Sequence, residues 1–347
     1  MAVSRRQFIG AASSAFISAG IAARSLSATS MPSVKPARLE PGMTVGLVTP
    51  ASNAPEDEQL YAAVELVQSL GFEARPARNL FSRTQYLAGT DAQRVSDLNE
   101  MFADPEVDAI FCARGGFGSG RLLRDIDYNI IRANPKVLMG YSDITALLNS
   151  IQLYTGLITF HGPMAGENFS SYTLDQYLRV LVQPIPETRI GEPPPFENSP
   201  GVVERTNRLT QIVRGIAEGR LIGGNLSLLV TLMGTPYEPV FDDAILFLED
   251  VFESPYSVDR MLTHLWLTGK LERLSGVVLG KFTDDDYSGN TFSMEEVFRN
   301  RFEPLGLPTL RGLMIGHVED QTVVPIGVLA RLDVDAGTLT LLESAVL

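Results

Sequence analysis

Short apolar runs alternate with segments of helical periodicity between residues 44 and 165, and this alternation restricts the fold more than any other feature. The strand-like runs are residues 44–50, 107–113, 137–139 and 157–163. Helices are predicted over 56–70 and 93–102, and from about Leu122 and Ile144. Strands that alternate with helices are typical of an open, mostly parallel sheet with helices on its faces. We therefore predict an N-terminal α/β domain over residues 38–183.

A proline-rich stretch at residues 184–207 interrupts the alternation. It is predicted to be a linker, because prolines and charges accumulate in it and no periodicity continues through it. Short strand-like runs follow, at residues 213–217, 244–248, 276–280, 322–326 and 330–334. Helices are predicted near residues 226–233, 258–268 and 294–302. We predict a smaller, β-rich α+β domain over residues 208–347.

The first 30 residues look like a twin-arginine signal peptide. Arg5 and Arg6 precede a mildly apolar run at residues 10–23, and small residues follow at 25–30. The apolar run is shorter than the roughly 20 residues that a bilayer span needs. We predict a mature protein that is periplasmic or otherwise exported and has no membrane span. The alternative is a cytoplasmic N-terminus with a chance pair of arginines.

Composition excludes several classes of function. The formal net charge is −13, and no basic face stands out, so nucleic-acid binding is not expected. A single cysteine, Cys112, excludes an intrachain disulfide and a cysteine-rich metal site. The glycine-rich turn at residues 115–120 follows a strand, but it lacks the lysine of a phosphate-binding loop. We expect neither a metal ion nor another cofactor.

A serine lies at the turn between one strand and the next helix. The apolar run 137–139 leads into Gly140, Tyr141 and Ser142, and helical periodicity begins near Ile144. A serine on such a turn has an exposed hydroxyl, and the N–H groups of the new helix point toward it. Ser142 is therefore a candidate nucleophile. The alternative is that Ser142 or Asp143 only caps the helix.

A serine nucleophile needs a base, usually a histidine that a carboxylate orients. His317 and His161 each end a strand-like run, whereas His264 lies in a helical pattern and is predicted to be a packed helix residue. Glu249 and Asp250 end a very apolar run. A carboxylate there could be held against an imidazole, or it could simply meet solvent.

Six short motifs occur along the chain in a fixed order. They are Arg-Gly-Gly-Phe-Gly at 114–118, Gly-Tyr-Ser-Asp-Ile-Thr at 140–145, Phe-His-Gly-Pro at 160–163, Gly-Gly-Asn-Leu at 223–226, Leu-Phe-Leu-Glu-Asp at 246–250 and Gly-His at 316–317. Each is weak alone, but their order and spacing together are specific. The chain resembles the LD-carboxypeptidase family of serine peptidases, which includes the microcin C immunity peptidases. The resemblance covers roughly residues 39–345.

The resemblance implies a catalytic triad that is assembled from both domains across one cleft. Ser142 would be the nucleophile, Glu249 the orienting acid and His317 the general base. The order Ser, Glu, His matches α/β-hydrolases, but the turn at Ser142 lacks their second glycine. We therefore do not assign that fold.

The resemblance also implies an oxyanion hole made of backbone N–H groups. The expected donors are Asp143 and a glycine of the preceding turn, Gly115 or Gly116. Two further residues are candidates for substrate binding. Arg114 could pair with a peptide carboxylate or form a structural ion pair, and His161 could be a structural residue or form part of the pocket wall.

The activity implied is removal of the terminal D-Ala from a murein tetrapeptide through an acyl-enzyme. The substrate would be a small peptide or muropeptide, and a homodimer is a candidate assembly. One alternative is the same triad acting on other conjugates, such as microcin C-like acyl-nucleotide peptides. The other is a non-enzymatic periplasmic binding protein.

Overall fold

The computed structural model describes residues 32–197, 199–284 and 289–347. The predicted signal peptide, residues 1–30, lies outside these ranges. Within them, no helix carries an apolar stretch long enough to cross a membrane.

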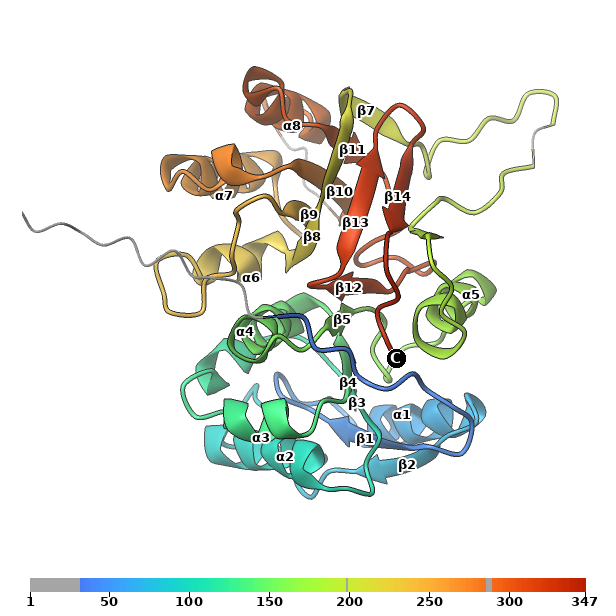
Figure 1. Cartoon of the computed structure of the whole chain (residues 1–347), viewed down its shortest axis with the longest axis vertical. Coiled ribbons are helices and arrows are strands. Elements are labelled where there is room, and N and C mark those ends of the chain that lie inside the picture. The colour runs from blue at the N-terminus through green and yellow to red at the C-terminus, as the bar shows by residue number, and fades with distance from the viewer. Residues whose placement is uncertain (1–31, 198, 285–288) are drawn as a thin grey trace, which may run out of the picture.

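The first sheet has six strands in the order β12-β5-β4-β3-β1-β2 (Figure 1). Its strands are β1 (Thr44–Val48), β2 (Glu73–Pro76), β3 (Ala109–Cys112), β4 (Val137–Gly140), β5 (Thr159–His161) and β12 (Val324–Ile326). All pairs are parallel except β12 with β5. The associated helices are α1 (Glu58–Ser69), α2 (Asp91–Ala103), α3 (Tyr128–Ala133), α4 (Thr145–Thr155) and α5 (Ser171–Tyr177). Helices α2, α3 and α4 contact one another in series, and α1 packs against β1 and β2.

Local sequence explains where these elements begin and end. Both β3 and β4 are fully buried, as expected for apolar strands inside a parallel sheet. Thr90 and Gln93 form a capping box at the start of α2. At the other end of a helix, Gly156 takes the left-handed conformation that terminates α4.

The second sheet has eight strands in the order β6-β14-β13-β8-β9-β10-β11-β7. They are β6 (Thr188–Ile190), β7 (Thr210–Val213), β8 (Ile216–Asn225), β9 (Ile245–Val251), β10 (Gly276–Thr283), β11 (Thr309–Arg311), β13 (Leu329–Asp333) and β14 (Thr338–Leu341). The inner strands from β8 to β11 are parallel, and the outer pairs are antiparallel. A separate apolar cluster is formed with α6 (Leu226–Thr231), α7 (Pro255–Leu267) and α8 (Met294–Phe302).

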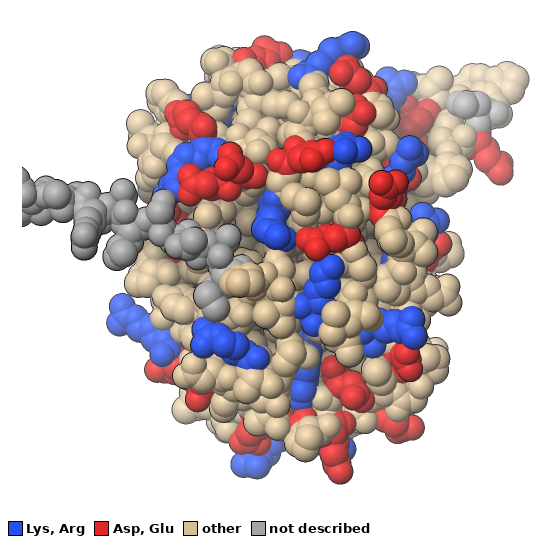
Figure 2. All heavy atoms as spheres, in the orientation of Figure 1, with Lys and Arg blue, Asp and Glu red and all other residues tan. Residues whose placement is uncertain are grey.

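The two sheets share one hydrophobic core. A single cluster of buried side chains includes Leu138 of β4, Phe160 of β5, Leu221 of β8 and Leu332 of β13. Strand β12 comes from the C-terminal half of the chain but pairs with β5 of the first sheet (Figure 1). On the face drawn in Figure 2, acidic and basic side chains are interspersed.

The predicted fold class, a mostly parallel α/β sheet followed by a second sheet with helices, is confirmed. Two local predictions were wrong. The helix expected from Leu122 is a 3-10 turn over Ser119–Leu122, and α3 begins later because the Asp127 side chain caps it. The run 213–217 is not one strand, because Gly215 has a φ of 137° and separates β7 from β8.

Candidate active site

Ser142 follows the carboxyl end of β4, at the start of a 3-10 turn that leads directly into α4. Its φ is 57°, a left-handed conformation that is uncommon for a residue other than glycine. Such strain is found at nucleophile turns, where it keeps the hydroxyl accessible. The Ser142 side chain is half-buried and forms no hydrogen bond with any described residue.

The glycine-rich turn follows β3, the strand next to β4, so both turns meet at one edge of the sheet. Gly115 lies very close to Ser142. A Cβ atom on Gly115 would lie 3.2 Å from Cβ and 3.5 Å from Oγ of Ser142, and 2.8 Å from Cε of Met164. No acceptor among the described residues bonds the N–H of Gly115 or Gly116. Free N–H groups beside the nucleophile are what an oxyanion hole requires.

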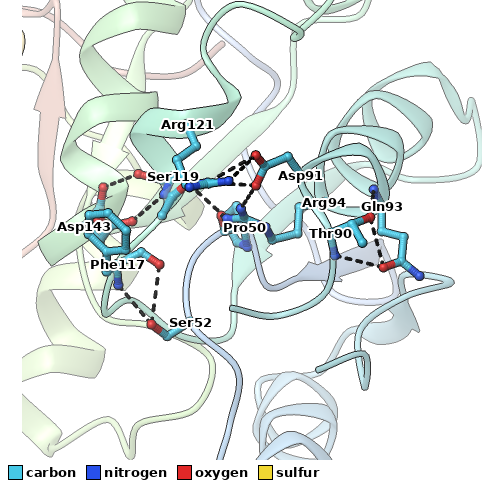
Figure 3. Close-up of polar contacts among 11 residues, drawn as sticks. Pro50, Ser52, Thr90, Asp91, Gln93, Arg94, Phe117, Ser119, Arg121 and Asp143 are labelled. Atoms are coloured by element: carbon cyan, nitrogen blue, oxygen red, sulfur yellow. Dashed lines mark hydrogen bonds and ion pairs between the residues drawn. The ribbon is translucent and has the colours of Figure 1, made fainter. Parts of the chain in front are cut away.

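Hydrogen bonds hold the glycine-rich turn in place from two sides (Figure 3). On one side, Ser52 Oγ accepts from the N–H of Phe117 at 3.0 Å. On the other, the buried Arg94 donates to the carbonyl of Gly118 at 3.0 Å and pairs with Asp91. Asp91 also accepts two bonds from Arg121. A turn fixed this way holds its N–H groups in position before a substrate arrives.

A further contact joins this turn to Asp143, the residue after Ser142. The side chain of Asp143 accepts from the N–H of Ser119 at 2.7 Å, and the Ser119 hydroxyl donates to the Asp143 carbonyl (Figure 3). Asp143 is buried, and the bond ties its backbone to the glycine-rich turn. The two groups of expected oxyanion donors are thus part of one rigid network.

The second half of the chain supplies an acid and a histidine. Glu249 lies near the carboxyl end of β9 with 0% of its surface exposed, and its Oε2 is 2.7 Å from Nδ1 of His317. A glycine makes this contact possible. Gly316 has a φ of 113°, and a Cβ atom there would lie 2.7 Å from Glu249 Oε2. The bond at Nδ1 leaves Nε2 of His317 as the free ring nitrogen.

The structure separates the roles of the two acids at the end of β9. Asp250 does not contact His317; it accepts from Asn225 Nδ2 at 2.9 Å and from the N–H of Ser227 at 2.9 Å, at the start of α6. Burial, and then the charge of Glu249, raises the pKa of Asp250 to about 6. Of the two acids, Glu249 is therefore the one that contacts the imidazole, whereas Asp250 caps the start of α6.

The pKa of His317 is raised above its ordinary value. Burial alone would lower this pKa, but the hydrogen bond that His317 Nδ1 donates to Glu249, and then the negative charge of Glu249, outweigh burial. This is the arrangement in which a carboxylate holds an imidazole in one tautomer and stabilises its protonated form.

Buried hydrogen bonds fix the two halves of the site relative to each other. Helix α4, which begins just after Ser142, carries Thr145 and Asn149. Thr145 Oγ1 accepts from the N–H of Asn225 at 3.0 Å, and Asn149 donates to the carbonyl of Gly223 at 2.8 Å. Asn225 is paired in register with Glu249 across β8 and β9. The turn at Ser142 is thus anchored to β8, the strand beside Glu249.

Ser142 and His317 line one cavity of about 440 Å³, together with Arg114, Gly115 and Gly116. Arg114 Nη1 reaches Gln59 Oε1 at 3.4 Å, and no described residue forms an ion pair with it. No hydrogen bond joins Ser142 to His317 among the described residues, and such contacts are often long before substrate binds. The cavity therefore brings together the predicted nucleophile, base, glycine turn and arginine.

Two histidines lie away from this cavity. His161 is completely buried, neither ring nitrogen has a hydrogen-bond partner among the described residues, and burial lowers its pKa to about 4. Its ring packs against Tyr141 and Phe247 and is not part of the cavity lining, which corrects the predicted place in the pocket wall and leaves the structural alternative. His264 lies in α7 as expected but is exposed rather than packed.

Among the residues of the cavity wall that the sequence did not indicate are Tyr141 and Glu167. The hydroxyl of Tyr141 donates to Glu167 Oε1 at 2.7 Å, and the Tyr141 ring lies 4.7 Å from the His317 ring between centroids. Tyr141 was visible as the neighbour of Ser142, but nothing local marks Glu167, which lies in a loop after β5. Within residues 32–197, 199–284 and 289–347, no group of three or more His, Cys, Asp and Glu is placed to hold a metal ion.

Comparison with known proteins gives two family matches, one in each half of the chain. Residues 45–162 match the LD-carboxypeptidase N-terminal domain, and residues 218–332 match the LD-carboxypeptidase C-terminal domain. A probable murein peptide carboxypeptidase of Bacillus subtilis is 40% identical over 86% of this chain and 91% of its own. The murein tetrapeptide carboxypeptidase of Pseudomonas aeruginosa is 31% identical over 83% of this chain and 92% of its own.

Solved structures agree with these matches. The structure of MccF in complex with glutamyl sulfamoyl guanosine has a TM-score of 0.80 and 28% identity, covering 90% of this chain and 99% of that one. The muramoyltetrapeptide carboxypeptidase of Oxalobacter formigenes has a TM-score of 0.73 and 29% identity, covering 86% and 98%. Two domains of the chain match the family models, and relatives align with it over most of its length. The chain therefore belongs to the LD-carboxypeptidase family of serine peptidases.

Proposed function

We propose that this protein removes the terminal D-Ala from murein tetrapeptides, with Ser142 as nucleophile, His317 as general base and Glu249 as orienting acid. The observation that carries the proposal is the bond between buried Glu249 and His317 Nδ1, which leaves Nε2 free on a residue that lines the same cavity as Ser142. The names of two relatives, a murein peptide and a murein tetrapeptide carboxypeptidase, support this substrate class.

The proposed reaction has two steps. Ser142 Oγ attacks the carbonyl carbon before D-Ala, while its proton passes to Nε2 of His317. The N–H groups of Gly115 or Gly116 and of Asp143 stabilise the oxyanion, and loss of one such donor typically costs about 100- to 1,000-fold in rate. The amine of D-Ala leaves with the proton from His317. Water, activated by the same imidazole, then releases the tripeptide from Ser142.

A substrate panel tests the proposal. We expect purified protein to convert muramyl tetrapeptide into tripeptide with one equivalent of D-Ala, measured by mass spectrometry and chiral amino-acid analysis. The same tetrapeptide ending in L-Ala is the control, and it should remain intact. A glutamyl sulfamoyl nucleotide belongs in the panel because a structural neighbour, MccF, is described in complex with one. Hydrolysis of that compound with no release of D-Ala would replace murein peptide by acyl-nucleotide conjugates as the substrate class.

We also propose that the protein is exported through the twin-arginine pathway, on the order of Arg5-Arg6, an apolar run and small residues in the sequence. Replacing both arginines by lysine should leave the protein in the cytoplasmic fraction of cells that otherwise export it. Unchanged location in fractionated cells would contradict the proposal. Activity of the purified variant is the control, since it should be unaltered.

Two further proposals concern organisation. We place the domains at residues 38–183 and 208–347, because one family match lies within each range. Residues 184–207 join them and also contribute strand β6 to the second sheet. A homodimer is proposed from the family resemblance, and light scattering during size-exclusion chromatography would test it. A monomer at all accessible concentrations would reject that assembly.

A further inference from the structure

Two buried residues near the catalytic cavity carry polar atoms that have no partner among the described residues. They are both ring nitrogens of His161 and Oε1 of Glu249, whose other oxygen contacts His317. His161 and Glu249 are each 0% exposed. Buried polar groups in folded proteins nearly always have a hydrogen-bond partner. A bond that satisfies both residues at once would connect His161 to the Glu249–His317 pair.

Strand β9 directs Glu249 toward the first sheet. Alternate residues of a strand point to opposite faces. Phe247, two residues before Glu249, belongs to the hydrophobic core that the two sheets share, whereas Leu246 and Leu248 belong to the separate cluster of the second sheet. The ring of His161, which ends β5 of the first sheet, lies 5.3 Å from the ring of Phe247 between centroids. Glu249 therefore lies on the face of β9 that packs against His161.

Two further contacts place His161 close to the pair. The ring of Tyr141 packs against both histidines, 5.8 Å from the His161 ring and 4.7 Å from the His317 ring between centroids. A Cβ atom on Gly224, in the strand that pairs with β9, would lie 3.3 Å from His161 Nδ1. Burial lowers the pKa of His161 to about 4, and the negative charge of Glu249 acts on this pKa in the opposite direction. His161 is thus a neutral imidazole within electrostatic reach of Glu249.

The hydrogen-bonding requirements of the two residues are complementary. A neutral imidazole has one N–H donor and one acceptor nitrogen, whereas an ionised carboxylate only accepts. No direct hydrogen bond joins His161 to Glu249. One water can bridge two such groups, and a bridging water is nearly as favourable in enthalpy as a direct bond. Buried waters typically bond to polar groups that would otherwise lack partners.

Resting on the proposed peptidase function, we propose that His161 is a positioning residue whose ring N–H is bonded, through one buried water, to Oε1 of Glu249. This bond fixes the rotation of the carboxylate, whose Oε2 accepts from Nδ1 of His317. A carboxylate that is held at both oxygens keeps the imidazole in one orientation, as a rigid supporting shell does for a catalytic group. His161 acts from outside the cavity lining.

The test removes the N–H groups of His161 and keeps an aromatic ring in their place. His161→Phe should lower kcat about 10- to 100-fold with little change in KM, because a hydrogen bond to a charged group is lost away from the cavity. It should also lower the pKa of His317, since a less well oriented Glu249 stabilises the protonated imidazole less. Glu249, Glu167 and Asp250 are the charged groups that raise this pKa, and all three remain in the variant. NMR titration of the His317 ring measures the pKa without substrate.

A conservative variant and a control separate this role from simple packing. His161→Gln brings back an N–H donor, and it should restore most of the kcat and of the His317 pKa. His264→Phe removes an exposed imidazole of α7 and should change neither value. Equal loss in His161→Gln and His161→Phe would overturn the proposal, because packing rather than the N–H would then matter. An unchanged His317 pKa in His161→Phe would overturn it as well.

A measurement on wild-type protein keeps the proposal testable if both His161 variants fail to fold. The nitrogen chemical shifts and proton exchange of the His161 ring should show a neutral imidazole with one slowly exchanging, hydrogen-bonded N–H. A ring without a hydrogen-bonded N–H would reject the proposal. The NMR measurements need no turnover, so they also distinguish the two proposals. A lowered His317 pKa in His161→Phe, with no peptide hydrolysis by the wild type, would reject the peptidase function and keep the positioning role.

Discussion

Replacing Ser142 by alanine is expected to lower kcat on the tetrapeptide by at least about 10⁴-fold, because the acyl-enzyme can no longer form. Residual hydrolysis would come from the oxyanion donors and binding alone. The free energy of unfolding should change little, since the Ser142 side chain forms no hydrogen bond with a described residue. Stopped assays over hours, together with thermal unfolding, measure both effects.

Two controls accompany this variant. Ser69→Ala changes an exposed serine at the end of α1 and should keep full activity. A fluorophosphonate probe should label wild-type and Ser69→Ala protein but not Ser142→Ala protein. Retention of more than about a tenth of the wild-type kcat by Ser142→Ala would remove this residue from the mechanism, given the loss expected for a nucleophile.

Replacing Glu249 by glutamine is expected to lower kcat by about 10⁴-fold, because the amide no longer holds the required tautomer or stabilises the imidazolium. The pH profile should change as well. The hydrogen bond and charge of Glu249 raise the pKa of His317 against the effect of burial. In the wild type, the midpoint of the acid limb of the kcat/KM profile should therefore lie above the ordinary histidine pKa of about 6.5. In Glu249→Gln this midpoint should move to lower pH.

Activity and stability should depend on pH in opposite directions. The base must be neutral, so activity falls as pH drops through the raised pKa of His317. The stability contributed by protonated His317 is fully present below about pH 6.5 and is lost as pH rises through the raised pKa. Thermal unfolding from pH 5 to 9 should show that the wild type loses this contribution to stability as pH rises, whereas Glu249→Gln does not.

Asp250→Asn is the matched control, since it makes the same chemical change one residue along β9. It should destabilise the start of α6, where Asp250 accepts from Asn225 and Ser227, while kcat falls far less than in Glu249→Gln. If the two variants lost activity equally, or if the acid limb stayed in place in Glu249→Gln, the assignment of Glu249 as orienting acid would fail.

Local pattern predicted the elements that carry the candidate site. Apolar runs of strand length and helical spacing placed β1, β3, β4, α1 and α4 correctly to within a few residues. Short strands such as β2, β6 and β14 went unrecognised, because three or four residues carry too little periodicity.

The order of motifs along the sequence by itself determined the family, the strand-to-helix turn at Ser142 and the set of residues able to do chemistry. Tertiary structure alone decided which of them meet. It joined Glu249 rather than Asp250 to His317, buried His161 away from the cavity, and set Glu167 beside Tyr141. It also carried β12 from the second half into the first sheet. The physical reason is that periodicity reports which face of an element is buried, whereas the partner it is buried against is chosen by contacts between residues distant in sequence.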